Sequence, residues 1–509
     1  MVATAYLALD IVALISFVFL VNKIRNRKKG RLLYPPGPKP LPVIGNLLDV
    51  PGPKEHSWIT YAEWAKRYGD VVSMQILGKV IVILHSNEAA RELLDKRAAI
   101  YSDRPSIPFW ELMNWTWLLF VIPYSQRWRI RRRMLDRGLR PSAALQYRPM
   151  QKQKVHYFLK QLLVRPEGFR RHLEYLQASI MLSIAYGYDV RDEHDRFLKV
   201  VVDANVLGGT TILPGSVIVN SLPFLKRFPG WLPGMGFQSL AKVGRKLGEE
   251  MVQAPFNFVK ESMNKGSASP SVTFDNLQEL DPNLDPSEYE DAERAIAEAS
   301  GSIYIAGADS TVSTLASIFL VLAINPDIQK KAQTEIDSVT GGVRLPDYDD
   351  RARLPYINAM CTELLRWKQV GPLDDVYDGH FIPKGATVFA NLWAILHDHN
   401  VYPEPEEFVP ERFLNDDGRG KVDSVLATAF GYGKRICPGR HLVDSTIFIL
   451  VASILATFNI RKANDAEGNE IPIRCEFTGG ALSHPKAFEC SITSRSAKAD
   501  ELITAATWV

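Results

Sequence analysis

The sequence predicts a mainly α-helical fold with minor β sheets, preceded by one N-terminal transmembrane helix. Apolar residues recur at steps of three and four through most of the region 89–458, which is the spacing of amphipathic helices. Clear strand patterns are confined to one stretch before this region, one short segment near Thr387–Phe389 and short segments in the last forty residues. The first twenty or so residues form a nearly unbroken apolar run. Together these observations indicate a helical globular part held at a membrane.

Residues 1–22 are expected to form the membrane anchor. The stretch Ala3–Val21 is apolar except mainly for Asp10, and about 19 residues are enough to cross a hydrocarbon core of roughly 30 Å. A charge such as Asp10 costs roughly 2.5–3.5 kcal/mol in the membrane, which the surrounding Leu, Ile, Val and Phe should offset. The alternative is a cleaved signal peptide, but such peptides have a basic start and a shorter apolar run.

A basic cluster follows the apolar run and sets the expected orientation. Its members are Lys23, Arg25, Arg27, Lys28, Lys29 and Arg31. Because Lys and Arg stay on the cytoplasmic side, we expect a lumenal N-terminus and a cytosolic catalytic part. Residues 23–50 form a basic and proline-rich linker, in which the prolines of 35–42 give a stiff, extended connector. Residues 51–509 form the expected catalytic domain.

The elements of that domain are predicted in chain order. Val71–Ile76 and Val80–Leu84 alternate like the two strands of a hairpin. Three later segments have strong helical periodicity, namely Lys152–Leu163, Leu173–Ala185 and Ile328–Val339. The polar, proline-containing stretch Asn264–Glu290 is expected to be an exposed loop before a long helix from about Glu293 to Leu322. Short strands are expected near Thr387–Phe389 and in the last forty residues.

Composition excludes several classes of protein. The 509 residues are 46% hydrophobic and 23% charged, with a net charge of only +3, so no nucleic-acid partner is expected. The four cysteines are Cys361, Cys437, Cys475 and Cys490. Their spacing fits neither a zinc site nor a dense disulfide framework, which favours a reduced, cytosol-facing catalytic part.

The segment Phe430–Gly439 carries the strongest chemical pattern. Cys437 lies in a glycine-rich turn, with Arg435 two positions before it and an apolar helix from about His441 to Leu455 after it. A thiolate at a helix N-terminus is stabilised by the helix dipole and free backbone N–H groups. These are the requirements of a single-thiolate haem ligand, which donates charge to iron and favours O–O cleavage. The alternative is a buried structural cysteine.

A second pattern lies inside the long predicted helix. In the segment 306–311, Ala306 and Gly307 remove side-chain bulk from one turn, so that a ligand can approach the backbone. Asp309 and Ser310 then place an acid beside an alcohol, a pair that can pass protons to a bound oxygen. The alternative is a helix whose polar residues are satisfied by its neighbours.

These segments resemble the cytochrome P450 family over nearly the whole chain. The haem-ligand signature F-x-x-G-x-R-x-C-x-G of that family matches at every fixed position, from Phe430 through Arg435 to Cys437. The resemblance implies the helical fold of that family, a haem b cofactor and Cys437 as the ligand of its iron. Trp128 and Arg132 match the W-x-x-x-R of the helix that contacts the haem propionates, and Arg435 would be the second propionate cation.

The same resemblance assigns roles to two further groups of residues. The helix segment is similar to A-G-x-[DE]-T-T, so Asp309 and Ser310 would deliver protons, with serine in place of the usual threonine. Glu363, Arg366 and Arg412 match a buried ionic cluster that supports the haem-ligand loop in the family. Considered alone, a Glu–Arg pair three residues apart is usually a surface pair of little energetic value.

The expected activity is that of a haem-thiolate monooxygenase in the endoplasmic reticulum membrane. It would insert one oxygen atom from O2 into a lipophilic small molecule, in secondary metabolism or xenobiotic oxidation. Electrons would come from NADPH through a separate NADPH-cytochrome reductase. The candidate pocket residues are Phe109, Trp110, Met113, Leu213, Ala306, Val370 and Phe477.

One departure from the family pattern leaves two alternatives open. Several residues that the family carries after Leu373 are missing before Asp374, including a propionate contact and a pocket-lining strand. One alternative is therefore a haem protein made inactive by this shortened segment. The other is a haem-thiolate isomerase or dehydratase that needs no reductase, against which the acid–alcohol pair Asp309–Ser310 argues.

Overall fold

The computed structural model describes most of the chain, in two compact units. The described residues are 34–52, 55–190, 192–212, 216–367, 382–383, 385–421, 425–479 and 482–506. The expected anchor, the basic cluster and the shortened segment after Leu373 all lie outside these residues. The smaller unit draws on 1–103, 372–395 and 432–435, and the larger unit contains the rest.

A three-stranded sheet organises the smaller unit. Strands β1 (Val71–Ile76) and β2 (Lys79–Leu84) form the predicted antiparallel hairpin, and β3 (Thr387–Ala390) pairs in parallel with β2. The side chains of β2 alternate between two apolar clusters, one on each side of the sheet. The helices of this unit are α2 (Ser57–Tyr68), α3 (Asn87–Ala90), α4 (Ala98–Tyr101) and α17 (Leu392–Leu396), with a π-helical turn at Arg91–Asp95 and a 3₁₀ turn at Gly433–Arg435.

The larger unit is built almost entirely of helices. Its first helices are α5 (Pro108–Leu112), α6 (Gln126–Leu139), α7 (Pro141–Ala144), α8 (Arg148–Val164), α9 (Phe169–Tyr186), α10 (Arg196–Thr211), α11 (Ile218–Ser221) and α12 (Phe237–Asn264). The later ones are α13 (Val272–Gln278), α14 (Pro286–Ile324), α15 (Pro326–Thr340), α16 (Pro355–Trp367), α18 (Val425–Ala429), α19 (Arg440–Thr457) and α20 (Ala497–Ala505). Strands β4 (Phe458–Lys462) and β5 (Cys490–Ser494) pair antiparallel near the C-terminus.

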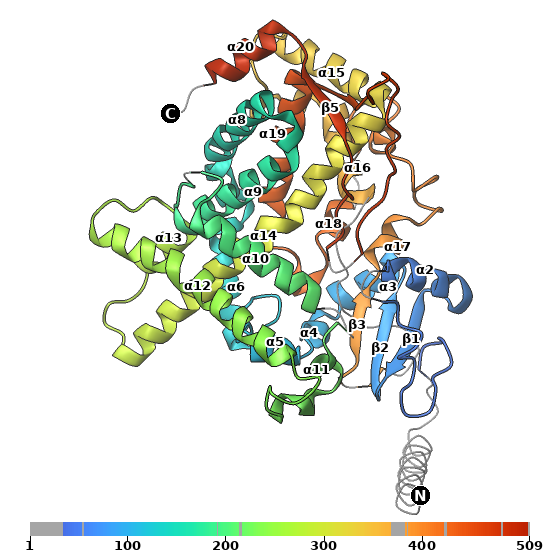
Figure 1. The fold of residues 1–509 in the computed structure, drawn as a ribbon, viewed down its shortest axis with the longest axis vertical. Coiled ribbons are helices and arrows are strands. Elements are labelled where there is room, and N and C mark those ends of the chain that lie inside the picture. Colours follow the sequence, from blue (N-terminus) through green and yellow to red (C-terminus); the bar gives the residue numbers. More distant parts are fainter. Residues whose placement is uncertain are drawn as a thin grey trace, which may run out of the picture. The chain divides into compact units, whose positions relative to one another are not determined.

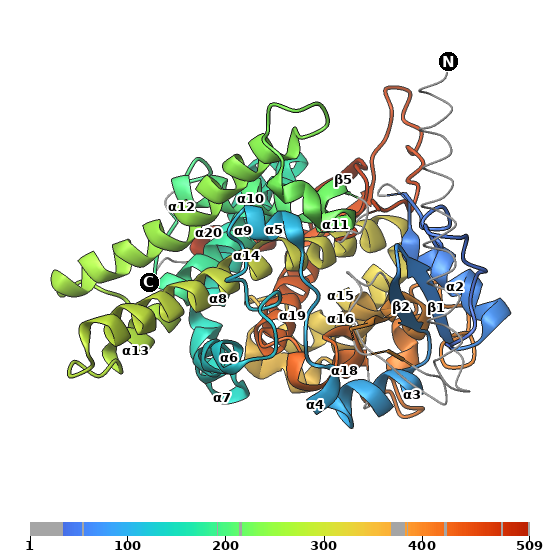
Figure 2. The ribbon, with the colours of Figure 1, turned by 90° about the horizontal axis from the view of Figure 1, so that it is seen from below.

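Helix α14 is the centre of the larger unit. It contacts α6, α9, α10, α12 and α16, and α9 runs beside it over much of its length (Figure 1). The side chains from Ala295 to Ile305 and from Thr311 to Ala323 are buried on every face, as expected for a helix that is apolar all round. Both views place α12 beside α10, and both of these helices contact α14 (Figure 2).

Helices α14 and α19 are each long and apolar enough to cross a membrane. However, 72% of the most apolar window of each helix is buried inside the protein. Burial of this kind is typical of the core helices of a globular domain. These two helices therefore form the interior of the larger unit.

The predicted loop Asn264–Glu290 is partly wrong, because the structure places helical turns inside it. Ser271 accepts a hydrogen bond from the Phe274 N–H and begins α13, which runs from Val272 to Gln278. Helix α14 then begins at Pro286, earlier than the predicted Glu293. A serine cap and a proline in the first turn are both local signals of a helix start, and they outweigh the polar composition of this stretch.

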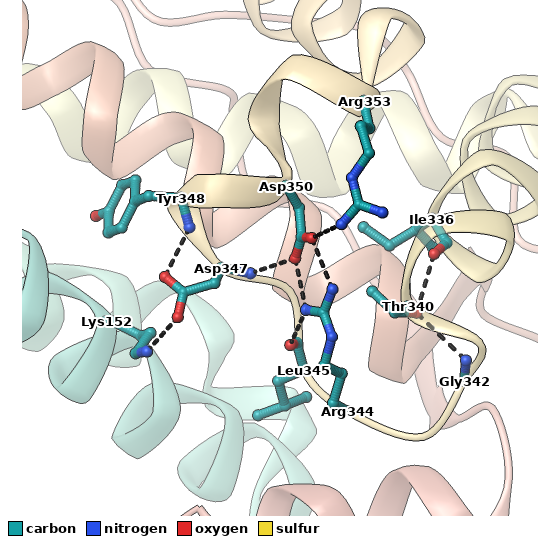
Figure 3. A network of polar contacts seen from close by, with 10 residues as sticks. All are labelled: Lys152, Ile336, Thr340, Gly342, Arg344, Leu345, Asp347, Tyr348, Asp350 and Arg353. Atoms are coloured by element: carbon teal, nitrogen blue, oxygen red, sulfur yellow. Dashed lines mark hydrogen bonds and ion pairs between the residues drawn. The ribbon is translucent and has the colours of Figure 1, made fainter.

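A polar network fixes the entry to α16. The carboxylate of Asp350, which is only 3% exposed, accepts two hydrogen bonds of 2.6 Å from Arg344 and one of 2.6 Å from Arg353. It also accepts from the Asp347 N–H at 2.9 Å, which completes a capping box for the 3₁₀ turn Tyr348–Arg353 (Figure 3). This turn leads directly into α16, the helix that carries the Glu363–Arg366 pair.

Candidate functional site

The cysteine segment is a tight turn that ends at the start of a long helix. The Cys437 N–H donates to the Phe430 carbonyl at 2.9 Å, and Gly439 occupies the N-cap of the 18-residue helix α19. Gly431 has a φ of 78°, a conformation that glycine adopts at no steric cost. The free thiol of Cys437 therefore lies where unpaired backbone N–H groups and the positive end of a helix dipole converge.

The charges around this thiol favour an anion, whereas burial opposes one. Burial raises the pKa of the Cys437 thiol above its ordinary value, while the Gly439 N–H and the cations of Arg132 and Arg440 act in the opposite direction. Arg440 also donates to the Cys437 carbonyl at 3.0 Å. A metal cation at the sulfur would supply the charge that the buried thiolate needs.

Helix α6 is bonded to the cysteine segment through Arg132. Its Nη1 donates to the Ile436 carbonyl at 2.7 Å, and its Nε donates to the Asp136 carboxylate at 2.8 and 3.0 Å. Trp128, one turn earlier, is buried and packs against Tyr124 with ring centroids 5.2 Å apart. The structure thus brings the predicted residues Arg132 and Cys437 together.

Arg435 belongs to the smaller unit. Its Nε donates to the Ser102 carbonyl at 2.8 Å, and its side chain is half-buried. Beside it in the sequence, the Gly433 N–H donates to the Asp95 carboxylate at 2.7 Å. A side chain at Gly433 would meet the Leu94 carbonyl oxygen at 2.0 Å, so only glycine fits there.

Two arginines of α6 are engaged in contacts with α14. Arg131 is buried and donates to Glu298 of α14 at 2.7 Å, and Arg127 donates to the same carboxylate at 3.1 Å. The Arg129 guanidinium lies 4.9 Å from the ring centroid of Tyr124. Because two arginines are committed to Glu298, α6 is joined to α14 by a largely buried ion pair.

The turn Ala306–Thr311 interrupts the burial of α14. Ala306 is exposed, and Gly307, Asp309 and Ser310 are half-buried, whereas the residues before and after them are covered. The Ser310 hydroxyl donates to the Ala306 carbonyl at 2.9 Å. An exposed face of small side chains within an otherwise buried helix fits the approach of a flat ligand.

The structure gives a different reason for glycine at position 307 from the one that the sequence suggests. A Cβ at this position would lie 2.1 Å from the Met181 sulfur of α9. The Gln177 amide of α9 donates to the Gly307 carbonyl at 2.8 Å. Glycine therefore favours the close approach of α9, because a side chain at 307 would force Met181 to move, while Ala306 provides the open face.

The predicted ionic cluster is buried, as the resemblance implied. Glu363 and Arg366 are both 0% exposed and are joined by hydrogen bonds of 2.6 and 2.8 Å. Arg412 Nε lies 3.5 Å from the same carboxylate, and the Val409 N–H donates to it at 2.9 Å. Arg366 further donates to the Leu396 carbonyl at 2.9 Å. This cluster joins α16 to the segment that precedes the cysteine turn.

Three of the candidate pocket residues are buried in the core of the larger unit. Phe109 and Met113 have no exposed surface, so the expectation that they line a pocket is wrong in this conformation. The reason is α12, where Gly244 leaves room for the Met113 side chain. Trp110 is also buried and donates to the Thr211 hydroxyl at 3.0 Å.

The other candidate pocket residues differ in their exposure to solvent. Phe477 is covered and packs edge-on against Trp367, with centroids 6.0 Å apart. Ala306 keeps its exposed position on α14. Leu213 and Val370 lie outside the described residues.

Sequence reasoning missed three residues that contact the candidate site. His484 lies 3.4 Å from the Asp309 carboxylate, Gln177 holds the Gly307 carbonyl, and Glu298 binds the arginines of α6. All three contacts join segments far apart in the sequence. Only the position of His484, shortly after the turn at Phe477, could have drawn attention to it. Within the described part of the chain no group of three or more His, Cys, Asp or Glu is arranged to hold a metal.

Comparisons with known proteins show the family. The cytochrome P450 family model matches residues 35–491. Cytochrome P450 monooxygenase COX1 of Coprinopsis cinerea is 38% identical over 518 aligned residues, which cover 98% of this chain and 99% of that protein. Cytochrome P450 monooxygenase claR of Ampulloclitocybe clavipes is 40% identical, with 92% and 88% covered. Cytochrome P450 monooxygenase ppsD of Aspergillus oryzae is 37% identical, with 97% and 95% covered.

The chain belongs to the cytochrome P450 family and is a monooxygenase. Haem b, iron protoporphyrin IX, is the cofactor of this family and of this chain. The residues present fit that group. A thiol lies at the N-terminus of α19 beside two arginines, and α14 carries an exposed face at Ala306.

Proposed function

We propose that this monooxygenase oxidises a lipophilic small molecule, with Cys437 as the iron ligand and NADPH as the source of electrons through a separate reductase. The observation that carries the proposal is the thiol of Cys437 at the start of α19, in a turn bonded to Arg132. A single thiolate is the protein ligand of a haem-thiolate centre, and among the described residues no three or more His, Cys, Asp or Glu side chains are grouped to hold a metal ion.

The residues around the cysteine would hold the cofactor. Trp128, Arg132 and Arg435 would contact the haem propionates, since a guanidinium binds a carboxylate with paired N–H groups. Phe430 begins the turn, and its carbonyl accepts a hydrogen bond from the Cys437 N–H. When bound, haem b supplies the activation of O2 for insertion of one oxygen atom into a substrate C–H bond.

Asp309 and Ser310 would manage protons on the α14 side. Asp309 is half-buried and Ser310 is adjacent to it, so an acid and an alcohol share one turn. The Ser310 hydroxyl donates to Ala306, and a rotation about its side-chain bond would free it to donate elsewhere. Serine has fewer rotamer restraints than threonine because it lacks the methyl group. We therefore expect proton delivery with less fixed geometry than a threonine would give.

We infer a lipophilic substrate from the methyl group that Ala306 presents at the exposed turn of α14. Secondary metabolism or xenobiotic oxidation would supply such compounds. The relatives support the monooxygenase class, and their names do not fix a substrate for this chain.

The proposed location is the endoplasmic reticulum membrane. Residues 1–22 would span the bilayer once, and the basic residues of the linker 23–50 would keep the catalytic domain 51–509 on the cytosolic side. A reductase anchored in the same membrane could then reach the domain. Membrane extraction of the full chain with carbonate would test the anchor, because an integral protein stays in the pellet.

The function is tested by oxidation assays in microsomes that contain the full chain and a reductase. A panel of lipophilic compounds is first screened for those that perturb the haem absorption spectrum on binding. We expect one of the binding compounds to gain an oxygen atom, detected by mass spectrometry, only when NADPH, O2 and the reductase are all present. Conversion without NADPH would instead identify a reductase-independent isomerase or dehydratase. Absence of haem would favour an inactive protein.

A further inference from the structure

Asp309 has a partner outside α14, namely His484. The Nε2 atom of His484 lies 3.4 Å from the Asp309 carboxylate, and the two side chains are 28% and 31% exposed. Each is thus partly in contact with water and partly covered by protein. A histidine in this position can hold the carboxylate and exchange protons with solvent.

His484 is held in place by its own loop. The Thr478 N–H donates to the His484 carbonyl at 2.8 Å, and the His484 N–H donates to the Thr478 hydroxyl at 3.0 Å. Phe477 pairs with Pro485 across the base of the loop in an antiparallel bridge. Both the N–H and the carbonyl of His484 are therefore held by hydrogen bonds to Thr478.

The loop is also bonded to two helices. The Ser313 hydroxyl of α14 donates to the Ser483 carbonyl, one helical turn after Asp309 and on the same helix face. From the other side, Arg170 of α9 donates to the Pro485 carbonyl at 2.9 Å and to the Lys486 carbonyl. These contacts are made by the residues on either side of His484 in the sequence. The loop that directs His484 at Asp309 is therefore attached to both helices.

The charged groups around this pair come from three elements. Asp309 is on α14 and His484 on the loop, while Glu174, Arg170 and Arg171 come from α9. Desolvation and the nearby charge of Asp309 raise the pKa of Glu174, and His484 and the two arginines act against that rise. Glu174 also lines a surface hollow of about 520 Å³ together with Arg171. Glu174 thus faces a surface hollow and is also one of the charged groups near the Asp309–His484 pair.

We propose that His484 is a positioning residue that orients the Asp309 carboxylate and relays solvent protons to it. The proposal rests on the proposed role of Asp309 and Ser310 in proton delivery. In each relay the protonated imidazole gives its Nε2 proton to Asp309 and keeps its Nδ1 proton. The free Nε2 then takes a new proton from solvent water, to which the His484 side chain is partly exposed. No electron moves in this step, and the net result is the transfer of one proton inward.

The test compares His484→Gln with Ser313→Ala in the haem-loaded full chain. Glutamine can keep a hydrogen bond to Asp309 but cannot titrate, whereas Ser313→Ala loosens the loop and leaves every titratable group in place. The main readout is the fraction of NADPH electrons recovered in product rather than in hydrogen peroxide. We expect His484→Gln to lower that fraction roughly tenfold, which is a smaller effect than the loss of a direct general acid would have. Ser313→Ala should lower it less than twofold.

Two further readouts separate proton relay from loop structure. In the parent enzyme the coupled fraction should change with pH, and in His484→Gln it should be independent of pH, because glutamine cannot gain or lose a proton. Amide hydrogen exchange of residues 477–486, measured by mass spectrometry, should rise in Ser313→Ala and stay unchanged in His484→Gln. Equal uncoupling in both variants, or an unchanged pH profile in His484→Gln, would overturn the relay.

Asp309→Asn distinguishes failure of the relay from failure of the proposed function. If Asp309→Asn uncouples the enzyme and His484→Gln does not, the relay is wrong and the role of Asp309 stands. If Asp309→Asn is fully coupled, the proton-delivery role itself fails, and the relay fails with it.

Discussion

Arg132 Nη1 donates to the carbonyl of Ile436, the residue before Cys437, across a hydrogen bond of 2.7 Å. This bond joins the middle of α6 to the turn that presents the thiol. The same guanidinium is oriented by Asp136 one turn later on α6. A change at Arg132 should therefore disturb the cysteine turn as well as any contact that this cation makes with the cofactor.

Arg132→Ala is expected to reduce haem retention. It removes a half-buried cation and leaves the Ile436 carbonyl without its charged donor, which typically costs about 1.5–3 kcal/mol. Haem content per protein, measured after gel filtration, should fall several-fold. Arg133→Ala is the matched control, because Arg133 is exposed on the same helix. Equal haem content in the two variants would contradict the assigned contact.

Removal of Glu298 is expected to destabilise the larger unit. Arg131 and Glu298 side chains are 7% and 10% exposed and lie in direct contact. Glu298→Leu would leave the Arg131 charge buried without its partner, at a cost of about 3–5 kcal/mol in the free energy of unfolding. Chemical denaturation measures this loss. The double variant Arg131→Met with Glu298→Leu should recover most of it, and failure to recover would show that the ion pair is not the source.

Gly307→Ala is expected to destabilise α14, although alanine favours helices by about 1 kcal/mol over glycine. The added Cβ would lie 2.1 Å from the Met181 sulfur, and overpacking of this kind typically costs about 1–3 kcal/mol. Thermal unfolding should show a lower midpoint for the single variant. Adding Met181→Ala opens space at the contact, so the second substitution should cost less in the Gly307→Ala background than in the parent. Equal costs would mean that the contact does not decide the residue at 307.

Asp350 is expected to make stability depend on pH in the acid range. Hydrogen bonds from Arg344 lower the pKa of Asp350 to about 2, below its ordinary value. Because the folded pKa is depressed, the stabilisation is fully present above about pH 5 and is lost as pH falls through 2. Its size is roughly 1–2 kcal/mol, since Arg344 is partly exposed to solvent.

Urea denaturation of the parent and of Asp350→Asn at several pH values checks this expectation. The difference between their free energies of unfolding should be largest near pH 7 and should narrow steadily below pH 5. Asp349→Asn, at an exposed neighbouring position, should show no such trend. A difference that stays constant down to pH 3 would mean that the charge of Asp350 contributes little.

The parts of the fold predicted correctly from sequence are those with strong local signals. The hairpin of β1 and β2 follows from alternation around the turn at Leu77–Gly78, and α8, α9 and α15 follow from helical periodicity. The core of α14 was also predicted, but its first turn was not. The helix starts at Pro286, and the polar residues around this proline make the start hard to recognise in the sequence.

The candidate site was predictable where it depends on contiguous residues. The segment Phe430–Cys437 and the turn at Ala306 stand out in the sequence, and the structure shows how each is formed. The partners of these segments were not predictable, because Gln177, Glu298 and His484 reach them from distant elements. Such contacts depend on how helices pack, which single-sequence periodicity does not specify.

The central claim is that Cys437 is the thiolate ligand of the haem iron. It is tested most directly by the reduced, CO-bound difference spectrum of the full chain in microsomes, with Cys437→Ala and, as a control, Cys475→Ala at an exposed cysteine. We predict a strongly red-shifted Soret band in the parent and in Cys475→Ala, and its loss in Cys437→Ala. A red-shifted band that persists in Cys437→Ala, or a parent protein with only the unshifted band, would contradict the account.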